Sequence, residues 1–305
     1  MKHQCPRVSV IVPYYNREAF LPSLIQCLNE QTFKNFEVLF IDDCSEVPLH
    51  KSIEFGKFDL NFSYKILRNS INLGVSESRN IGVTQSQGEY ICYLDSDDGW
   101  TRDKLDRCVQ ECEKLEQEIK VFLMSKTTVI TGEQRSSLPN ISRFEHHSGE
   151  DYLFKDGLFA QVSSFFLSRS LASTISFNSS LRQYEDFLYF IDAYNQAEER
   201  IFVQDNLVEW ENDQSRSDRL SNQKSYQQAQ DFMQVLESQS DKSSINKFYM
   251  RFVLPYSFYS NKRSSIKHIK ESLVSQNLTK KQTAWLIIRA ILGERAIAKL
   301  RDLFK

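Results

Sequence analysis

The chain has 305 residues, of which 41% are hydrophobic and 26% charged, and its formal net charge is −2. This length allows one large domain with an accessory region, or two domains, and the composition is that of a globular protein in water. No apolar run approaches the roughly 20 residues of a membrane-spanning helix. The N-terminus shows no secretory signal, and the six cysteines show no disulfide spacing, so we expect reduced thiols in a cytoplasmic protein.

The first 117 residues alternate between short β-branched or apolar runs and longer segments with helical periodicity. Strands are predicted at Val8–Val12, Phe36–Ile41, Phe62–Leu67 and Tyr90–Leu94. Helices are predicted at Glu18–Gln31, Leu49–Phe58, Ser76–Gln85 and Arg102–Gln117. This alternation is typical of an α/β, Rossmann-like protein, with a mostly parallel central sheet flanked by helices.

The later part of the chain alternates less regularly. A strand is predicted at Ile119–Ser125 with Thr127–Thr131 pairing beside it, a polar loop at Gly132–His147, a helix within Arg182–Gln196, and one or two short strands within Ile201–Trp210. Nearly all patterns after Ser221 are helical. We therefore expect an α/β domain over residues 1–217 and a helical C-terminal region over residues 218–305.

Residues 90–100 read YICYLDSDDGW, an apolar strand followed at once by the carboxylates of Asp95, Asp97 and Asp98. Crowded carboxylates at the end of a buried strand repel one another unless a cation or many donors offset their charge. Ligands also bind at the carboxyl ends of strands in open α/β sheets. The pattern predicts a divalent-metal site at Asp95 and Asp97. An acidic turn, with Asp98 or Thr101 capping the next helix, remains an alternative.

Polar and aromatic side chains follow all four predicted strands. The first strand is followed by Pro13, Tyr15 and Asn16, the second by Asp42 and Asp43, the third by Asn72, Gly74, Ser76, Arg79 and Asn80, and the fourth by Asp95, Ser96 and Asp97. Strand ends of a parallel sheet meet at one edge, so we expect these residues to gather there. A ring can stack on a base, a carboxylate can accept base or ribose hydrogen bonds, and Arg79 can face phosphate. The set suits a nucleoside diphosphate neutralised by a hard cation, although each residue alone could be a turn former or solvated side chain.

Three runs, VSVIVPYYNREAFLPSLIQCLNEQTFKNFEVLFIDDCS, NLGVSESRNIG and GEYICYLDSDD, together resemble the family 2 glycosyltransferases. The resemblance covers roughly residues 6–215 and is densest over the first 110. It implies a GT-A catalytic domain that transfers a sugar from a nucleotide diphosphate donor with inversion at the anomeric carbon. It also implies Mg²⁺ or Mn²⁺ as cofactor.

The resemblance assigns roles to individual residues. It places Pro13, Tyr15, Asp43 and Arg79 in the nucleotide site. Asp95 and Asp97 match the family's D-x-D motif, with Asp97 as direct metal ligand, and Asp186 matches the general base of its E-D motif. Without the resemblance, Asp186 would simply be a charge favourable to a helix N-terminus, and both readings can hold together. One departure is Cys44, where the family commonly has Gly, which puts the local backbone shape in question.

The last 44 residues are basic. Lys262–Lys305 holds eleven Lys and Arg and three acidic residues, a net charge of +8. Ala284–Leu292 is nearly all apolar, and Glu294–Lys305 places apolar residues on one helical arc with basic residues elsewhere. Such helices can lie on an anionic membrane surface. They can equally pack within the helical region with their lysines solvated, and this alternative stays open.

The implied function is an inverting glycosyltransferase of polysaccharide assembly. Its expected partners are a UDP-sugar donor, a growing saccharide or lipid-linked acceptor, and the cytoplasmic face of a membrane. A non-catalytic nucleotide-sugar binding protein stays open as a second class. A D-x-D phosphohydrolase is a third, although such enzymes usually place the motif after the first strand. No nucleic-acid-binding motif is present.

Overall fold

The computed structural model describes residues 5–115, 119–213, 226–257, 262–275 and 279–292. These residues form two compact units, and each unit is discontinuous in sequence. The first unit consists of Met1–Glu145, Phe159–Ser180 and Glu185–Ser215, and the second of His146–Leu158, Leu181–Tyr184 and Arg216–Lys305. We call the first the sheet unit and the second the helical unit. The helical unit includes two short segments that precede the boundary expected near residue 217.

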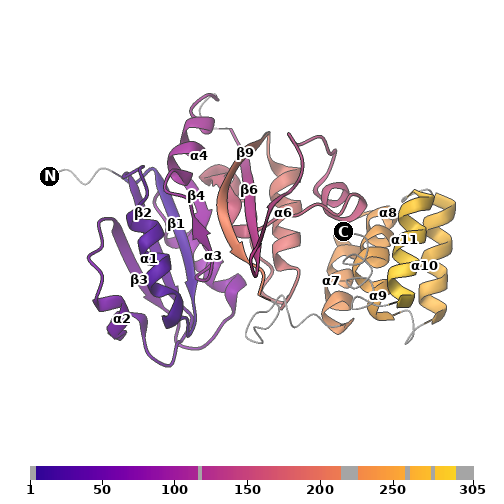
Figure 1. The fold of residues 1–305 in the computed structure, drawn as a ribbon, viewed down its shortest axis with the longest axis horizontal. Helices are drawn as coiled ribbons and strands as arrows, with labels where there is room; N and C mark the ends of the chain where they lie inside the picture. Colours follow the sequence, from indigo (N-terminus) through magenta and orange to yellow (C-terminus); the bar gives the residue numbers. More distant parts are fainter. Residues whose placement is uncertain (1–4, 116–118, 214–225, 258–261, 276–278, 293–305) are drawn as a thin grey trace. The chain divides into compact units, whose positions relative to one another are not determined.

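A nine-stranded sheet forms the centre of the described first unit (Figure 1). Its strands are β1 (Val8–Tyr14), β2 (Phe36–Asp42), β3 (Ser63–Arg68), β4 (Tyr90–Tyr93), β5 (Gly99–Trp100), β6 (Val121–Thr131), β7 (Gln134–Leu138), β8 (Phe165–Ser168) and β9 (Glu199–Glu211). They lie in the order β3-β2-β1-β4-β8-β6-β9-β5, with β7 paired to β6. The four strands β3, β2, β1 and β4 are parallel neighbours, so their carboxyl ends share one edge.

Helices cover both faces of this sheet. The first unit contains η1 (Glu18–Phe20), α1 (Leu21–Asn29), η2 (Leu49–Lys51), α2 (Ile53–Gly56), α3 (Val75–Gln85), α4 (Lys104–Cys112), η4 (Val162–Ser164), α5 (Arg169–Ala172) and α6 (Glu185–Gln196). On one face, alternate β1 residues such as Val10 share a core cluster with Leu24 of α1 and Leu105 of α4. On the other face, α3 packs so closely that a Cβ on Gly82 would come within 2.4 Å of Ile11 Cγ2.

The sequence predicts β1 to β4 correctly, but the central part of the sheet differs from expectation. The segment Thr127–Thr131 does not pair beside the preceding strand, because it is the continuation of β6 itself. Its antiparallel partner is β7, in a region where the polar sequence predicted a loop. The short strands expected within Ile201–Trp210 form one long strand, β9, which follows β6 past a register shift at Ser125 and Lys126.

The second unit is helical. Its elements are η3 (Asp151–Lys155), α7 (Tyr226–Gln239), α8 (Lys242–Phe248), η6 (Tyr249–Val253), α9 (Leu254–Ser257), α10 (Lys262–Ser275) and α11 (Lys280–Leu292). An aromatic cluster of Phe154, Tyr184, Phe232, Phe248 and Phe252 forms its centre. No helix in the described ranges is both long and apolar enough to cross a membrane. The helix expected at Glu294–Lys305 lies outside the described residues.

Candidate active site

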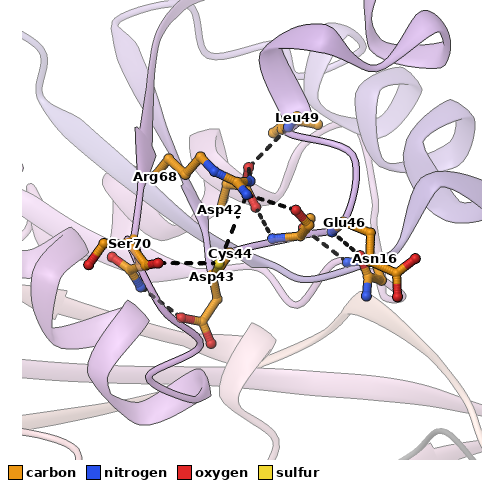
Figure 2. Close-up of polar contacts among 10 residues, drawn as sticks. Asn16, Asp42, Asp43, Cys44, Glu46, Leu49, Arg68 and Ser70 are labelled. Atoms are coloured by element: carbon orange, nitrogen blue, oxygen red, sulfur yellow. Dashed lines mark hydrogen bonds and ion pairs between the residues drawn. The ribbon is translucent and has the colours of Figure 1, made fainter.

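Asp42, the last residue of β2, is fully buried and holds the loop that follows it. Its Oδ1 accepts a hydrogen bond from the Ser45 N–H (2.9 Å), and its Oδ2 accepts from the Leu49 N–H (3.0 Å). Arg68 Nη1 lies 2.6 Å from the same Oδ2 (Figure 2). Burial alone would raise the pKa of Asp42, but these hydrogen bonds outweigh it and lower the pKa. Asp42 is therefore an internal anchor of the loop.

Asp43 joins the end of β2 to the start of α3. Its Oδ1 accepts hydrogen bonds from Asn69 Nδ2 and the Leu73 N–H, both at 2.8 Å, and its Oδ2 accepts from the Gly74 N–H at 2.8 Å. Gly74 has φ +88, a left-handed conformation that favours glycine. A carboxylate oxygen has two lone pairs, so Oδ2 retains acceptor capacity for a ligand group.

Cys44 adopts the left-handed conformation, with φ 63. Its Sγ lies 3.5 Å from the Ser70 carbonyl oxygen and 3.9 Å from Arg68 Nη2 (Figure 2). The backbone here thus keeps the shape that glycine would adopt freely, while a side chain occupies the position.

The ends of β1 and β3 present apolar side chains to solvent. Tyr15 is 46% exposed, Ile71 62% and Leu73 41%, and Asn72 between them is also exposed. Such side chains at one sheet edge suit the face of a nucleobase. The neighbouring residues make contacts within the protein. Pro13 is buried within β1, and Asn16 Oδ1 accepts a hydrogen bond from the Glu46 N–H (2.8 Å; Figure 2).

Arg79 of α3 connects two acidic segments that are far apart in sequence. The residue is 3% exposed, with Nη2 2.6 Å from Asp95 Oδ1 and Nη1 3.4 Å from Glu185 Oε1. The sequence suggests that Arg79 can face phosphate, and in the structure its charge lies between the carboxyl groups of Asp95 and Glu185. This bridge brings the end of β4 next to the first turn of α6.

Glu185 and Asp186 form that first turn. Asp186 is half-buried, and its Oδ1 accepts a hydrogen bond from the Phe187 N–H at 2.9 Å. Glu185 is buried. Burial raises its pKa to about 8, the charge of Asp186 adds to the rise, and Arg79 opposes it. Glu185 therefore holds a proton at neutral pH more readily than an ordinary glutamate.

Two stacked aromatic rings lie against the Arg79 guanidinium. The guanidinium carbon lies 4.9 Å from the ring centroid of Phe177, which stacks on Tyr189 at 3.8 Å and 3°. The Asn80 side chain holds the Phe177 backbone through two hydrogen bonds of 2.9 Å. Its Nδ2 donates to the Phe177 carbonyl oxygen, and its Oδ1 accepts from the Phe177 N–H. These contacts hold the arginine in one orientation.

The acidic turn after β4 has half-buried and buried members. Asp95 and Asp97 are half-buried, whereas Ser96 and Asp98 are 8% and 5% exposed. Burial raises the pKa of Asp98 well above its usual range, and repulsion from Asp95 and Asp97 adds to the rise. Helix α4 begins only at Lys104, so Asp98 does not cap it. Its carboxylate accepts hydrogen bonds from Ser163 and Gln161, and the Thr101 hydroxyl makes no hydrogen bond to the start of α4 either, so only the turn remains of that alternative.

A family model described as "Glycosyl transferase family 2" matches residues 9–175, which is more than half of the chain. The chain belongs to glycosyl transferase family 2. The matched range contains the ends of β1 to β4 and the Asp95–Asp98 turn, and it stops before Asp186. The role of Asp186 as base therefore remains a prediction from resemblance and position.

Named relatives of this family 2 chain include proteins of bacterial polysaccharide synthesis. It is 32% identical over 184 residues to the amylovoran biosynthesis glycosyltransferase AmsB of Erwinia amylovora, covering 59% of this chain and 61% of that protein. An uncharacterized glycosyltransferase of Haemophilus influenzae is 37% identical over 107 residues, covering 35% of each chain. The putative teichuronic acid biosynthesis glycosyltransferase TuaG of Bacillus subtilis is 32% identical over 103 residues, covering 33% and 40%. The matches thus span less than two thirds of each of these relatives.

Solved structures show the same fold. The crystal structure of S. aureus TarS 1–349 in complex with UDP-GlcNAc superposes with a TM-score of 0.62 at 20% identity, covering 96% of this chain and 83% of that one. The mannosyltransferase PcManGT from Pyrobaculum calidifontis, in complex with GDP-Man and Mn²⁺, gives a TM-score of 0.58 at 14% identity, covering 97% and 83%. The sheet unit of this family 2 chain therefore has the GT-A fold, as the sequence implied.

The donor set at the family 2 D-x-D turn fits a metal held jointly by protein and substrate. Within the described ranges, no group of three or more His, Cys, Asp or Glu side chains could hold a metal alone. Mg²⁺ is commonly held by one or two carboxylates together with substrate phosphates. Asp95 and Asp97 supply carboxylates of that kind, and one oxygen of Asp95 also pairs with Arg79.

The structure gathers most of the predicted site residues and adds several that sequence reasoning missed. Tyr15, Asp43 and Asn72 lie at the ends of adjacent strands, and Arg79 joins Asp95 to the segment of Asp186. The missed contributors are Asn69, Gln161, Ser163, Phe177 and Glu185. Glu185 carried a signal, since it stands directly before Asp186, whereas Asn69, Gln161, Ser163 and Phe177 belong to no motif in the sequence.

Proposed function

We propose that the protein is an inverting glycosyltransferase, which moves a sugar from a nucleotide diphosphate donor, expected to be a UDP-sugar, to an acceptor hydroxyl. One observation carries the proposal: Arg79 binds Asp95 and Glu185 at the same time. This bridge supports a single site in which the D-x-D carboxylates handle the leaving group and Asp186, beside Glu185, handles the acceptor.

The proposed reaction is a single displacement. The Asp186 carboxylate takes the proton of the acceptor hydroxyl, and that oxygen forms a bond to the anomeric carbon. The bond from this carbon to the diphosphate oxygen breaks, and its electron pair leaves with the nucleoside diphosphate. Attack opposite the leaving group inverts the configuration. Glu185 fits a supporting role, because its burial and raised pKa disfavour a free charge there.

Asp95 and Asp97 would hold a divalent cation. Mg²⁺ or Mn²⁺, when bound there, supplies Lewis-acid stabilisation of the charge that develops on the diphosphate. Arg79 would then contribute indirectly, because its bond to Asp95 Oδ1 orients that carboxylate. Asp97 stays the predicted direct ligand.

The donor's nucleoside would occupy the edge formed by the ends of β1, β2 and β3. The exposed ring of Tyr15 would stack on the base, and Asp43 Oδ2 would accept a hydrogen bond from the base or ribose. Asn16, Asn72 and Ser96 are proposed as further donor contacts, with Pro13 shaping the β1 end. In support, two structures with the same fold carry UDP-GlcNAc and GDP-Man.

The acceptor is proposed to be a growing saccharide or a lipid-linked saccharide in polysaccharide assembly, by analogy with the names of AmsB and TuaG. We further propose that the protein works at the cytoplasmic face of a membrane. Seven of the twelve exposed large apolar side chains among the described residues lie on just two helices of the helical unit: Ile266, Leu273 and Val274 on α10, and Trp285, Ile288, Ile291 and Leu292 on α11.

Basic residues accompany these apolar side chains. On α10, Ile266, Lys270 and Leu273 recur at helical spacing and so share one exposed face. Among the side chains whose exposure is described on the two helices, the exposed charges are Arg263, Lys267, Lys270, Lys280 and Lys281 against the single acid Glu271. Apolar side chains among lysines favour an anionic lipid surface. A second copy of the same face would bring like charges together.

Substitution of the proposed base tests the function. Asp186→Asn should lower kcat for transfer by about 10²–10⁴-fold, the usual contribution of a general base. Nucleotide binding, measured by calorimetry with UDP and Mn²⁺, should stay close to that of the parent. A suitable control is Asp205→Asn, which removes an exposed carboxylate paired with Arg107 and should keep full activity.

Two results would contradict the proposal. Transfer by Asp186→Asn at the parent rate would remove Asp186 from the base role. Tight donor binding by the parent without turnover, across a panel of nucleotide-sugars and saccharide acceptors, would instead indicate a non-catalytic binding protein.

A further inference from the structure

Asp98 differs from the two acidic residues before it in both exposure and partners. It is 5% exposed, and its Oδ2 accepts hydrogen bonds from Ser163 Oγ (2.6 Å) and Gln161 Nε2. Its own N–H donates to the Asp95 carbonyl oxygen at 3.0 Å, which closes the turn. Asp98 therefore points into the protein while belonging to the same four-residue turn as Asp95 and Asp97.

Ser163 contacts this turn at both ends. Its Oγ donates to Asp98 Oδ2 and also accepts the Asp95 N–H at 3.0 Å. Ser163 is fully buried, so these bonds are shielded from water. One hydroxyl thus links the first and last residues of the turn to a segment more than sixty positions away in sequence.

The segment that carries Ser163 is itself fixed. The Ser163 carbonyl oxygen accepts from Trp100 Nε1 at 2.9 Å, and the Ser164 carbonyl oxygen accepts from Lys104 Nζ at 3.4 Å. The Lys104 ammonium, fully buried, also lies 5.2 Å from the Trp100 ring centroid. Residues that follow the acidic turn therefore hold η4 in place, and η4 holds the turn.

We propose that Asp98 is a positioning residue: through Ser163 and Gln161 it fixes the Asp95–Asp98 turn, so that Asp95 and Asp97 keep the placement that donor binding requires. Its effect on donor use rests on the proposed function, whereas its effect on the turn does not. Residues that orient ligating side chains typically change affinity or activity by roughly 10–100-fold when replaced.

Four substitutions separate positioning from charge. Asp98→Ala removes the acceptor of both hydrogen bonds, whereas Asp98→Asn keeps an oxygen that can accept them while removing the charge. Ser163→Ala removes both links made by the hydroxyl, and Ser163→Thr retains a hydroxyl. Ser125→Ala is the matched control, because Ser125 is also a buried serine, and its Oγ has no hydrogen-bond partner in the described structure.

Hydrogen exchange tests the turn without reference to activity. Amides of residues 94–99 should exchange roughly tenfold faster or more in Asp98→Ala and Ser163→Ala than in the parent. They should exchange at near-parent rates in Asp98→Asn, Ser163→Thr and Ser125→Ala. Unchanged exchange in Asp98→Ala would overturn the proposal, whatever the protein's activity proves to be.

Kinetics tests the consequence for the donor. Asp98→Ala and Ser163→Ala should each raise the donor KM by roughly 10–100-fold, with a smaller change in kcat. Ser163→Thr, which keeps the hydroxyl, should have a donor KM close to that of the parent. Because both residues act through one bridge, the double variant should be little worse than either single one. Faster exchange with an unchanged donor KM would reduce Asp98 to a purely structural role. A parent that binds no donor would contradict the proposed function, while the exchange result would still decide whether Asp98 holds the turn.

Discussion

At the scale of single residues, Cys44 shows the cost of a side chain in a glycine conformation. Its φ of 63 falls in the left-handed region, which costs an L-residue roughly 1–2 kcal/mol. Glycine would avoid this cost but lose more entropy on folding. We expect Cys44→Gly to raise the free energy of unfolding by about 0.5–1 kcal/mol, measured by urea denaturation.

Cys44→Ala is the control for this substitution. It removes the Sγ contacts to Ser70 and Arg68 but keeps a Cβ, so it should leave stability unchanged or lower it. Equal stabilisation by both variants would show that the thiol, and not the backbone conformation, is the unfavourable group.

Glu185 should make stability depend on pH. Its pKa rises from 4.5 to about 8 on folding, so the folded chain keeps a proton that the unfolded chain releases. The stabilisation is fully present below pH 4.5 and is lost as the pH rises through 8. In the parent, this effect should lower the free energy of unfolding by on the order of 2–4 kcal/mol between pH 5 and pH 8. Glu185→Gln, which mimics the protonated acid, should remove that decline.

Urea unfolding at pH 5, 6.5 and 8 measures this effect. The comparison of parent and Glu185→Gln subtracts the contributions of all other titrating groups. Parallel pH curves for the two proteins would show that Glu185 is ionised in the folded state near its ordinary pKa.

At the scale of elements, helices α10 and α11 should direct membrane binding. The parent should sediment with vesicles containing phosphatidylglycerol and not with pure phosphatidylcholine, and added salt should weaken the binding. Lys267→Glu with Lys270→Glu should lower the partition constant at least about tenfold, because each basic residue near an anionic surface contributes about 1 kcal/mol.

Apolar contact is tested in the same assay. Ile288→Ser should also weaken binding, whereas Val47→Ser, which alters an equally exposed side chain in the sheet unit, should not. Equal partitioning of the parent and the charge-reversal variant would contradict the proposed lipid surface. Concentration-dependent dimerisation lost in Ile288→Ser would point to a second copy of the chain instead.

The elements also show what the sequence could predict. Strands β1 and β2 are buried along their whole length, so they read as nearly continuous apolar runs, interrupted only by Ser9 and by Glu37 before the terminal Asp42. Strand β7, QRSSL, is almost entirely exposed and carries no apolar signal, because its pairing with β6 alone makes it a strand. The length of β9 is likewise set by its partner.

The same limit applies to the site. Residues at strand ends could be named because their position follows from the parallel sheet. The pairing of Arg79 with Glu185 spans 106 residues, and that of Ser163 with Asp98 spans 65. No local pattern encodes contacts that form only when distant segments fold together.

At the scale of the whole molecule, the helical unit depends on segments outside the C-terminal region. Phe154 and Tyr184 are buried in its aromatic cluster against Phe232 and Phe248. A fragment of residues 1–215 would leave both rings uncovered. We expect it to bind a hydrophobic dye and to aggregate, as followed by fluorescence and light scattering.

A matched fragment isolates the cause. Residues 1–215 carrying Phe154→Ser and Tyr184→Asn should be markedly more soluble, since asparagine tolerates the positive φ of 64 at position 184. Equal solubility of the two fragments would show that these rings do not drive the aggregation.

Tyr184 and Glu185 are consecutive in the chain, yet the first belongs to the helical unit and the second to the sheet unit. A recombination event that replaced only residues 216–305 would carry new helices to a chain that still held the old Phe154 and Tyr184. Two of the five rings in that cluster would then meet partners they had not been selected with. We therefore expect the C-terminal helices to be inherited together with the residues just before Glu185 and not as an independent cassette. Natural and engineered chimeras should work best when all three segments of the helical unit come from one parent.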